Sequence, residues 1–175
     1  MVEAGRPRYS RAMDEAHLNL LREQSGLRLD REGQFLHQGE VVEHERLALA
    51  LHRGLHRAPD GRWATRLGSD WAYVQVDDVA RFVRAVAIDE RLGKLRAELV
   101  DGSEAVIDPS TLALGAADAL YVRMADGERA RLSRAAQLSL ANALIDQGGG
   151  KFALRIGERR YPVGADGGPE SARSA

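Results

Sequence analysis

The chain has 175 residues, with 25 basic side chains against 26 acidic ones and no cysteine. This length suits one domain, or two small subdomains that share a core, and the missing cysteines exclude disulfides, zinc–thiolate sites and thiol nucleophiles. The near-neutral charge argues against nucleic acid and anionic membranes as partners. The longest apolar run, residues 47–51, is too short to cross a bilayer, and the first residues lack the apolar core of a signal peptide, so we expect a soluble, cytoplasmic protein.

Hydrophobic spacing predicts a helix, a hairpin and a second helix in the first third of the chain. Residues 9–24 carry apolar side chains three and four positions apart and are followed by a glycine, which is typical of an amphipathic helix and its end. Residues 27–42 alternate apolar and polar side chains around turns at Gly33 and Gly39, which predicts a hairpin. Residues 44–56 predict a helix that lies on a sheet. Its apolar stripe consists of Leu47, Leu51 and Leu55, broadened by Ala48 and Ala50.

Strands joined by turns are expected in the middle of the chain. Residues 62–68 and 71–76 flank a turn at Gly68 and predict a second hairpin. Pro109 ends a group of three further strands, because proline cannot continue a strand ladder. We expect these three strands at residues 81–88, 94–100 and 104–108, with turns at Leu92-Gly93 and Asp101-Gly102.

A hairpin, a helix and a last hairpin are predicted after residue 118. The first hairpin turns at Asp126-Gly127, and Ser133 is a suitable N-cap for a helix from Arg134 to Asp146. Glycines 148–150 are expected to end that helix. The buried face of the helix would consist of Ala136, Leu140, Ala141, Leu144 and Ile145, and the last hairpin would comprise residues 151–157 and 159–164.

The heptapeptide RWATRLG at residues 62–68 is echoed by KFALRIG at residues 151–157. Both occupy the same place in the predicted order of hairpin, helix and hairpin, which indicates an internal repeat. The predicted fold class is α+β, with two hairpin–helix–hairpin units bridged by antiparallel strands. The predicted parts are an N-terminal helix at 1–26, a first repeat at 27–90, a second repeat at 91–164 and a disordered tail at 165–175.

The run from Gly26 to Val86 resembles an uncharacterised bacterial family, the domain of unknown function 1285. The resemblance lies in a strand that ends at Asp30, an aromatic at Phe35, the turn at Asp60-Gly61 and the segment from Val76 to Val83, and it continues to residue 164. It implies an α+β fold with internally repeated motifs, somewhat like pleckstrin-homology domains, and a role in signalling or ligand recognition. It implies no catalytic residues. The chain departs from the family pattern at residues 151–156, which carry fewer aromatics.

Four of the five histidines fall within twenty residues, which suggests a metal site as one alternative. His52 and His56 have the i, i+4 spacing that can chelate a divalent metal on a helix, and His44 shares their face, with His37 or Glu43 completing the site. The other interpretation places these rings beside the leucine stripe with their polar edges in water. The sequence contains no H-E-x-x-H motif, and Gly54 weakens the predicted helix between His52 and His56.

Other catalytic patterns favour structural interpretations. Ser69 lies in a turn and no G-x-S-x-G elbow is present. Asp77 and Asp78 would serve acid–base chemistry if they were buried together, but such a pair more often ends a strand. The glycines before Lys151 follow a predicted helix, whereas a phosphate-binding loop precedes one.

Aromatic residues and arginines in the paired hairpins form the predicted binding surface. One face of these strands is expected to line a groove between the repeats. The predicted function is therefore a non-enzymatic binding or signalling module for a small anionic ligand or a protein segment, without a cofactor. Homo-oligomerisation stays open, and the alternative is a metal-dependent hydrolase that uses the histidine face with Glu43 or Asp70. The candidate binding residues are Trp63, Arg66, Trp71, Tyr73, Arg155 and Tyr161.

Overall fold

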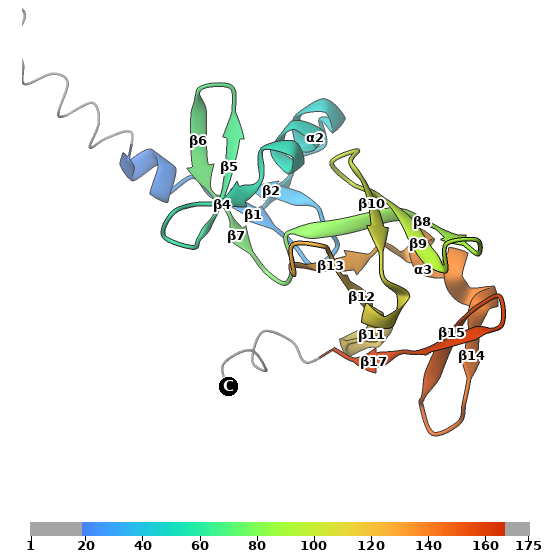
Figure 1. Ribbon diagram of the computed structural model, residues 1–175. Helices are drawn as coiled ribbons and strands as arrows, with labels where there is room; N and C mark the ends of the chain where they lie inside the picture. The colour runs from blue at the N-terminus through green and yellow to red at the C-terminus, as the bar shows by residue number, and fades with distance from the viewer. Residues whose placement is uncertain (1–18, 167–175) are drawn as a thin grey trace, which may run out of the picture. The chain divides into compact units, whose positions relative to one another are not determined.

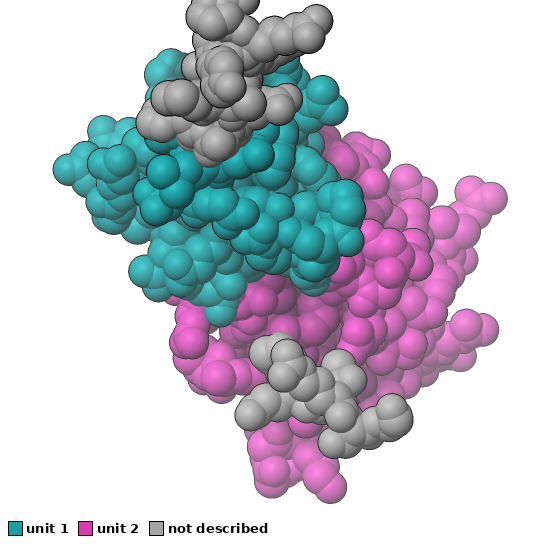
Figure 2. All heavy atoms as spheres, turned by 90° about the vertical axis from the view of Figure 1, so that its left-hand side faces the viewer, with its two compact units in different colours: residues 1–30, 34–77 teal, residues 31–33, 78–175 magenta. Residues whose placement is uncertain are grey.

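The fold is α+β, as the sequence predicts, with many short strands and few helices (Figure 1). The structure is a computed structural model in which residues 19–166 are described. These residues form two compact units, coloured separately in Figure 2. Unit 1 holds residues 19–30 and 34–77, and unit 2 holds residues 31–33 and 78–166. None of the helices within residues 19–166 has the length and apolar content needed to span a bilayer.

Unit 1 combines two small sheets with the helix α2 and a further helical segment. Residues 19–23 are helical, but the rest of the predicted N-terminal helix lies outside the described residues, as does the tail from residue 167. One sheet has the order β3-β2-β1-β7, in which β1 and β7 are parallel. The second sheet has the order β4-β5-β6 and follows the helix α2. The elements are β1 (Leu27–Leu29), β2 (Phe35–His37), β3 (Glu40–Val41), α2 (Glu45–Gly54), β4 (His56–Arg57), β5 (Trp63–Leu67), β6 (Asp70–Tyr73) and β7 (Gln75–Val76).

Helix α2 buries only part of the predicted leucine stripe, together with a histidine that was not expected inside. Leu51 is 2% exposed, but Leu47 is 41% exposed, and His52 is buried in its place. The ring of His52 meets the ring of Phe35 edge-on, with centroids 4.8 Å apart. The Thr65 hydroxyl of β5 donates a hydrogen bond to the Leu51 carbonyl at 2.7 Å. Contacts with β2 and β5 therefore decide which side of α2 faces inward, and the expectation that all histidine edges lie in water is wrong for His52.

Unit 2 contains a seven-stranded sheet, a helix and a three-stranded sheet. The large sheet has the order β10-β9-β8-β13-β12-β11-β17, and the small sheet has the order β14-β15-β16. Aliphatic side chains from both sheets and from α3 form one core, which includes Val83, Leu95, Leu140 and Leu154. The strands are β8 (Arg81–Asp89), β9 (Lys94–Leu99), β10 (Glu104–Ile107), β11 (Ala113–Leu114), β12 (Leu120–Arg123), β13 (Arg129–Leu132), β14 (Leu144–Asp146), β15 (Phe152–Ile156), β16 (Arg159–Pro162) and β17 (Gly164–Ala165). The helices are α3 (Arg134–Leu140) and the 3-10 helices η1 (Pro109–Thr111), η2 (Ala116–Asp118) and η3 (Ala141–Ala143).

The predicted hairpins and turns are largely confirmed, including the three strands before Pro109 and the N-cap at Ser133. The predicted helix from Arg134 to Asp146 is wrong in its second half, because α3 ends at Leu140 and residues 144–146 form β14. This strand pairs with β15, which satisfies its backbone groups in a sheet in place of a helix. Glycines 148–150 consequently form the turn between β14 and β15, each with a positive φ, and end no helix.

The predicted strand at 71–76 is divided at Val74. Its first part, β6, pairs with β5, and its second part, β7, pairs in parallel with β1 in the other sheet of unit 1. The Val74 amide donates to the Trp63 carbonyl at 2.9 Å, and the side chain of Val74 is buried. One strand thus crosses between two sheets, a feature that alternation of side chains does not reveal.

Several backbone hydrogen bonds of residues 44–77 have a counterpart in residues 133–166, 89 positions further along. Val163 donates to the Phe152 carbonyl at 2.9 Å, as Val74 donates to that of Trp63. The caps of the two helices correspond as well, since His44 accepts from the Leu47 amide and Ser133 from the Ala136 amide. Further matched bonds are Ala58–Arg62 with Gln147–Lys151, and Asp77–Leu29 with Asp166–Leu114.

Candidate functional site

A groove of about 670 Å³ in unit 1 is lined by basic and apolar side chains. We call it the basic groove. Its lining comes from α2 along its length, from β4 and from the end of β5. No aspartate or glutamate occurs among the described residues that line it, so the formal charges on its lining are all positive in a chain whose net charge is close to zero. The basic members are Arg46, Arg53, His56 and Arg66, and the larger apolar members are Leu49, Leu55 and Leu67.

Helical spacing and one close approach bring the basic side chains together. Arg46 and Arg53 are seven residues apart on α2 and therefore share a face of the helix. Gly54 allows the end of α2 to touch β5, because a Cβ there would lie 2.7 Å from the Arg66 nitrogen and closer still to its carbonyl oxygen. The His56 Nδ1 lies 2.7 Å from the Gly54 carbonyl, which can only accept, so Nδ1 carries a proton.

Two guanidinium groups of the basic groove have no acidic partner within residues 19–166. Arg66 donates from Nε to the Gly68 carbonyl at 3.0 Å, and Arg46 forms no ion pair with any described residue. Both side chains are exposed. A guanidinium without a carboxylate retains donors for a ligand, and its planar fork matches the oxygens of a carboxylate or phosphate.

Trp71 and Tyr73 of β6 lie together, as the sequence predicts from their alternation. Their rings meet edge-to-face with centroids 5.2 Å apart. Arg66 is the cross-strand partner of Trp71, so the two side chains share a face of the hairpin. The Arg22 guanidinium lies 4.7 Å from the centre of the Trp71 ring. One predicted binding residue, Arg66, therefore lies between the aromatic face and the basic groove.

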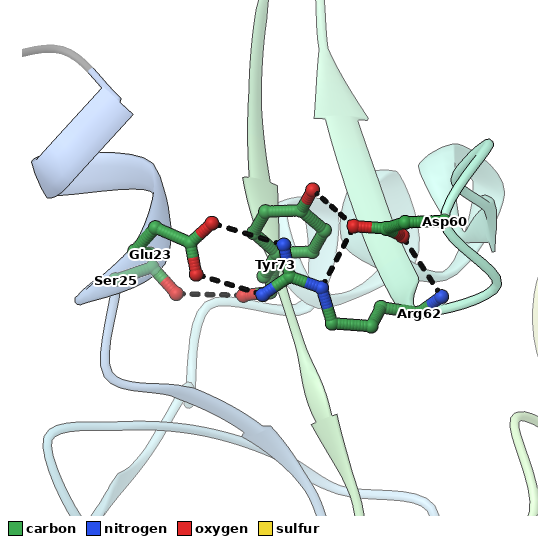
Figure 3. A network of polar contacts seen from close by, with 5 residues as sticks. All are labelled: Glu23, Ser25, Asp60, Arg62 and Tyr73. Atoms are coloured by element: carbon green, nitrogen blue, oxygen red, sulfur yellow. Dashed lines mark hydrogen bonds and ion pairs between the residues drawn. The ribbon is translucent and has the colours of Figure 1, made fainter. Parts of the chain in front are cut away.

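Tyr73 also belongs to a polar network with Glu23, Asp60 and Arg62, which was not predicted from the sequence (Figure 3). Arg62 lies over the Tyr73 ring at 3.5 Å and bonds to both Glu23 and Asp60. The hydrogen bond from the Tyr73 hydroxyl at 2.7 Å, followed by those from the backbone and side chain of Arg62, lowers the pKa of Asp60 to about 2. Because two carboxylates compensate Arg62, this network is structural: it ties residue 23 to the β5–β6 hairpin.

The remaining predicted binding residues lie elsewhere. The Arg57 guanidinium stacks on the Trp63 ring, 4.2 Å from its centre. Trp63 and Arg66 are three positions apart on β5, so their side chains lie on opposite faces of the strand, because successive side chains alternate. Arg155 and Tyr161 belong to unit 2, where the Tyr161 hydroxyl lies 3.5 Å from the Gly93 carbonyl. Four predicted residues thus belong to unit 1 and two to unit 2, and the role of all six in binding stays a prediction.

The histidines of the alternative metal site have separate structural roles. His44 caps α2 with its Nδ1, which accepts from the Leu47 amide at 3.3 Å, and His52 is buried against Phe35. His37 is exposed on β2. Within residues 19–166 no group of three or more histidine, aspartate or glutamate side chains has the arrangement of a metal site. Within the described residues, these histidines therefore do not gather into one metal-binding group.

Asp77 and Asp78 do not act as a pair, because each bonds within a different unit. Asp77 forms an ion pair with Arg28 at 2.7 Å in unit 1. Asp78 accepts from the Tyr121 hydroxyl at 2.6 Å in unit 2, where Arg131 lies 3.5 Å away. Burial, and then this hydrogen bond to Asp78, raises the pKa of Tyr121 to about 12. Both acids thus stabilise strands, in line with the structural interpretation.

Arg46 and Arg53 line the basic groove, although neither was predicted from the sequence as a binding residue. They lie on the polar side of a predicted amphipathic helix, where charged residues are normally solvated. The available signal was the spacing of two arginines along one helix face that carries no acidic residue after its first turn. Only the close approach of α2 and β5 turns that face into one wall of a groove.

Solved structures with the same fold support the resemblance seen in the sequence. A crystal structure of a domain-of-unknown-function-1285 protein from Silicibacter pomeroyi DSS-3 has a TM-score of 0.57 and 21% identity, and the match covers 84% of this chain and 82% of that one. A second member, from Shewanella baltica OS155, has a TM-score of 0.51 and 18% identity, covering 67% of this chain and 91% of that one. No family model and no curated protein sequence matches the chain.

At these identities the likeness concerns the fold. The chain therefore has the fold of the domain-of-unknown-function-1285 proteins, the family that its sequence resembles.

Proposed function

We propose that the protein is a non-enzymatic, cytoplasmic binding module that holds a small organic anion in the basic groove of unit 1. The observation that carries this proposal is the set of three arginines and one histidine around a groove without an acidic lining residue among those described. Association with an anion offsets the mutual repulsion of the three arginines, which otherwise costs stability.

The lining also favours a class of ligand. Arginine binds carboxylates and phosphates with two parallel hydrogen bonds, so the anionic group would lie against Arg46, Arg53 and Arg66. Leu49, Leu55 and Leu67 offer apolar surface beside them. A carboxylate or phosphate with an apolar body fits both features better than an inorganic ion does.

The chemistry of the basic groove supports binding without turnover. Catalysis of acyl or phosphoryl transfer needs a nucleophile beside a base, or a bound metal. The described lining contains no serine, threonine, aspartate or glutamate, and its one histidine donates Nδ1–H to the backbone. A signalling role, in which ligand occupancy alters a partner, is compatible with this chemistry.

Calorimetric titration with butyl phosphate, butyrate and inorganic phosphate tests the proposal. We expect saturable binding of the organic anions, tighter than that of inorganic phosphate, and an at least tenfold loss of affinity in the Arg46→Gln/Arg66→Gln double variant. Arg91→Gln, an exposed arginine of unit 2, is the matched control and should leave the affinity unchanged. Absence of binding, or equal binding by the double variant, would contradict the proposal.

We also propose that the chain is an internal duplication, as the twin heptapeptides indicate. Support comes from the hydrogen-bond pattern that recurs 89 positions apart and from the identical residues at those positions. An experimental structure in which residues 44–77 and 133–166 fail to superpose would refute it; the pleckstrin-homology likeness stays a prediction. The identical pairs are Leu49/Leu138, Leu51/Leu140, Leu55/Leu144, Gly61/Gly150, Ala64/Ala153, Arg66/Arg155, Gly68/Gly157, Val74/Val163 and Asp77/Asp166.

A further inference from the structure

A second groove, of about 390 Å³, lies in unit 2 between α3 and the strands β11, β12 and β15. We call it the apolar groove. Leu138 of α3 lines it and is 59% exposed. Exposed apolar surface gathered around a concave site is typical of a ligand pocket. Its apolar lining consists of Leu114, Leu120, Leu138, Leu144, Phe152 and Val163.

The strand registers of the two units show which residue of unit 1 corresponds to Leu120 of the apolar groove. In unit 1, Leu29 pairs with Phe35 on one side and with Val76 on the other. In unit 2, Leu114 pairs in the same way with Leu120 and Ala165. Leu120 therefore occupies the place that Phe35 occupies in unit 1.

Helix ends give a second correspondence. The Leu55 amide donates to the His52 carbonyl, and the Leu144 amide donates to the carbonyl of Ala141. Ala141, which lines the apolar groove, therefore stands where unit 1 has His52.

In unit 1 these two positions are filled by a pair of rings. Phe35 is 1% exposed, and its ring packs edge-on against that of the buried His52. Unit 2 has a leucine and an alanine there, so both rings are missing from its groove. Leu120 and Ala141 both line the apolar groove, so the side chains around them lack the dispersion contacts that a ring would supply.

The rim of the apolar groove carries one charge of each sign. Asp118 and Arg134 both line it, and both side chains are exposed. Asp118 and its neighbour Ala117 have φ values of 56° and 54°, a left-handed conformation that non-glycine residues rarely adopt. Backbone held in this region is concentrated at functional sites, because the surrounding structure must compensate its cost. The groove thus pairs an apolar interior with an anion and a cation at its mouth.

We propose that the apolar groove binds the ring of a free aromatic α-amino acid. The ring occupies the space that corresponds to Phe35 and His52, the ammonium group contacts Asp118, and the carboxylate contacts Arg134. Edge-to-face contact with Phe152 adds to the burial of the ring. This inference is independent of the basic groove of unit 1, which it neither requires nor excludes.

Calorimetric titration with L-phenylalanine tests the ligand class. We expect saturable binding with one site per chain. L-Leucine, which lacks the ring, phenethylamine, which lacks the carboxylate, and hydrocinnamate, which lacks the ammonium group, should each bind at least tenfold more weakly. Absence of saturable binding of L-phenylalanine, or equal binding of L-leucine, would overturn the proposal.

A double variant tests the location of the site. Leu120→Phe with Ala141→His installs the two rings that unit 1 already accommodates, and it should weaken L-phenylalanine binding at least tenfold. Should this variant fail to fold, Arg134→Gln tests the location of the site instead. It should weaken binding of L-phenylalanine at least fivefold but leave binding of phenethylamine, which has no carboxylate, unchanged. Val106→Ala, an exposed change on β10, is the matched control. Unchanged affinity in the folded double variant, or in Arg134→Gln, would refute the assignment.

Discussion

Gly54, the last residue of α2, lies against the backbone of Arg66 in β5 so closely that no side chain fits between them. A Cβ at Gly54 would lie 2.7 Å from the Arg66 nitrogen, a distance that real Cβ atoms essentially never show. The contact joins a helix to a strand that would otherwise be separated by a side-chain layer. It also places Arg66 next to the arginines of α2, which gives the basic groove its charge.

Gly54→Ala should therefore destabilise the protein, although alanine favours helix by about 1 kcal/mol over glycine. We expect a loss of about 2 kcal/mol or more in the free energy of unfolding, because α2 and β5 must move apart. Urea denaturation followed by circular dichroism measures it. Ala143→Gly, the change at the corresponding position of unit 2, is the control and should cost only about 1 kcal/mol. An increase in the free energy of unfolding for Gly54→Ala would show that the contact between α2 and β5 leaves room for a side chain.

Thr65→Val should cost about 1–2 kcal/mol of unfolding free energy. The Thr65 side chain is 2% exposed, and its hydroxyl donates to the Leu51 carbonyl at 2.7 Å. Valine keeps the shape but leaves the carbonyl without this donor. Thermal denaturation compares the variant with Thr65→Ser, which keeps the hydroxyl and loses only a methyl group. If Thr65→Ser proved less stable than Thr65→Val, packing would outweigh the hydrogen bond.

Acid should destabilise the protein between about pH 4 and pH 2. Hydrogen bonds from Lys94 and Ser110 lower the pKa of Asp108 to about 2 from its ordinary value of 3.8, and Asp60 is lowered to about 2 by Tyr73 and Arg62. A carboxyl with a depressed pKa stabilises the fold above its ordinary pKa, and this contribution disappears as pH falls through the folded value. Urea denaturation at pH 6, 4 and 2 measures the loss. The stability difference between the protein and Asp108→Asn should shrink over this range; a constant difference would contradict the assignment.

Tyr121 should ionise near pH 12, well above its ordinary pKa of 10.0. Its neutral hydroxyl donates to Asp78, so this contribution to stability is complete below pH 10 and is lost as pH rises through 12. Ultraviolet titration of tyrosinate follows the ionisation. Tyr121→Phe should abolish the step near pH 12 and cost about 1–2 kcal/mol at neutral pH. A titration of the variant that matches the parent protein would show that another tyrosine ionises there.

Ser133→Ala should destabilise α3 by about 1 kcal/mol, because the Ser133 hydroxyl accepts from the Ala136 amide at 3.2 Å and caps the helix. The same hydroxyl donates to the Arg84 carbonyl of β8 at 2.9 Å, so the loss includes a contact with the large sheet. Thermal unfolding measures the effect. Ser139→Ala, on the exposed side of α3, is the control and should change little; equal effects of the two changes would argue against a cap.

Local chemistry determined much of this fold. Turns at Gly33, Gly93 and Gly127 were predictable because glycine alone adopts positive φ without cost, and each of them has it. The N-cap at Ser133 was predictable because its hydroxyl satisfies a helix amide within the same segment. Alternation of apolar residues was enough to identify most hairpins, since one buried face imposes a period of two.

Only the tertiary structure decided the rest. Residues 144–146 form a strand and not a helix because β15 supplies their hydrogen-bond partners. The predicted strand at 71–76 is divided at Val74 because its second half pairs with β1. The basic groove depends on the contact of Gly54 with Arg66. The apolar groove depends on Leu120 and Ala141, which stand where unit 1 has two rings. The sequence by itself determined the turns, the N-cap at Ser133 and most strands, because these depend mainly on interactions between near neighbours. Strand partners and grooves depend on residues far apart in the chain, and packing alone brings those together.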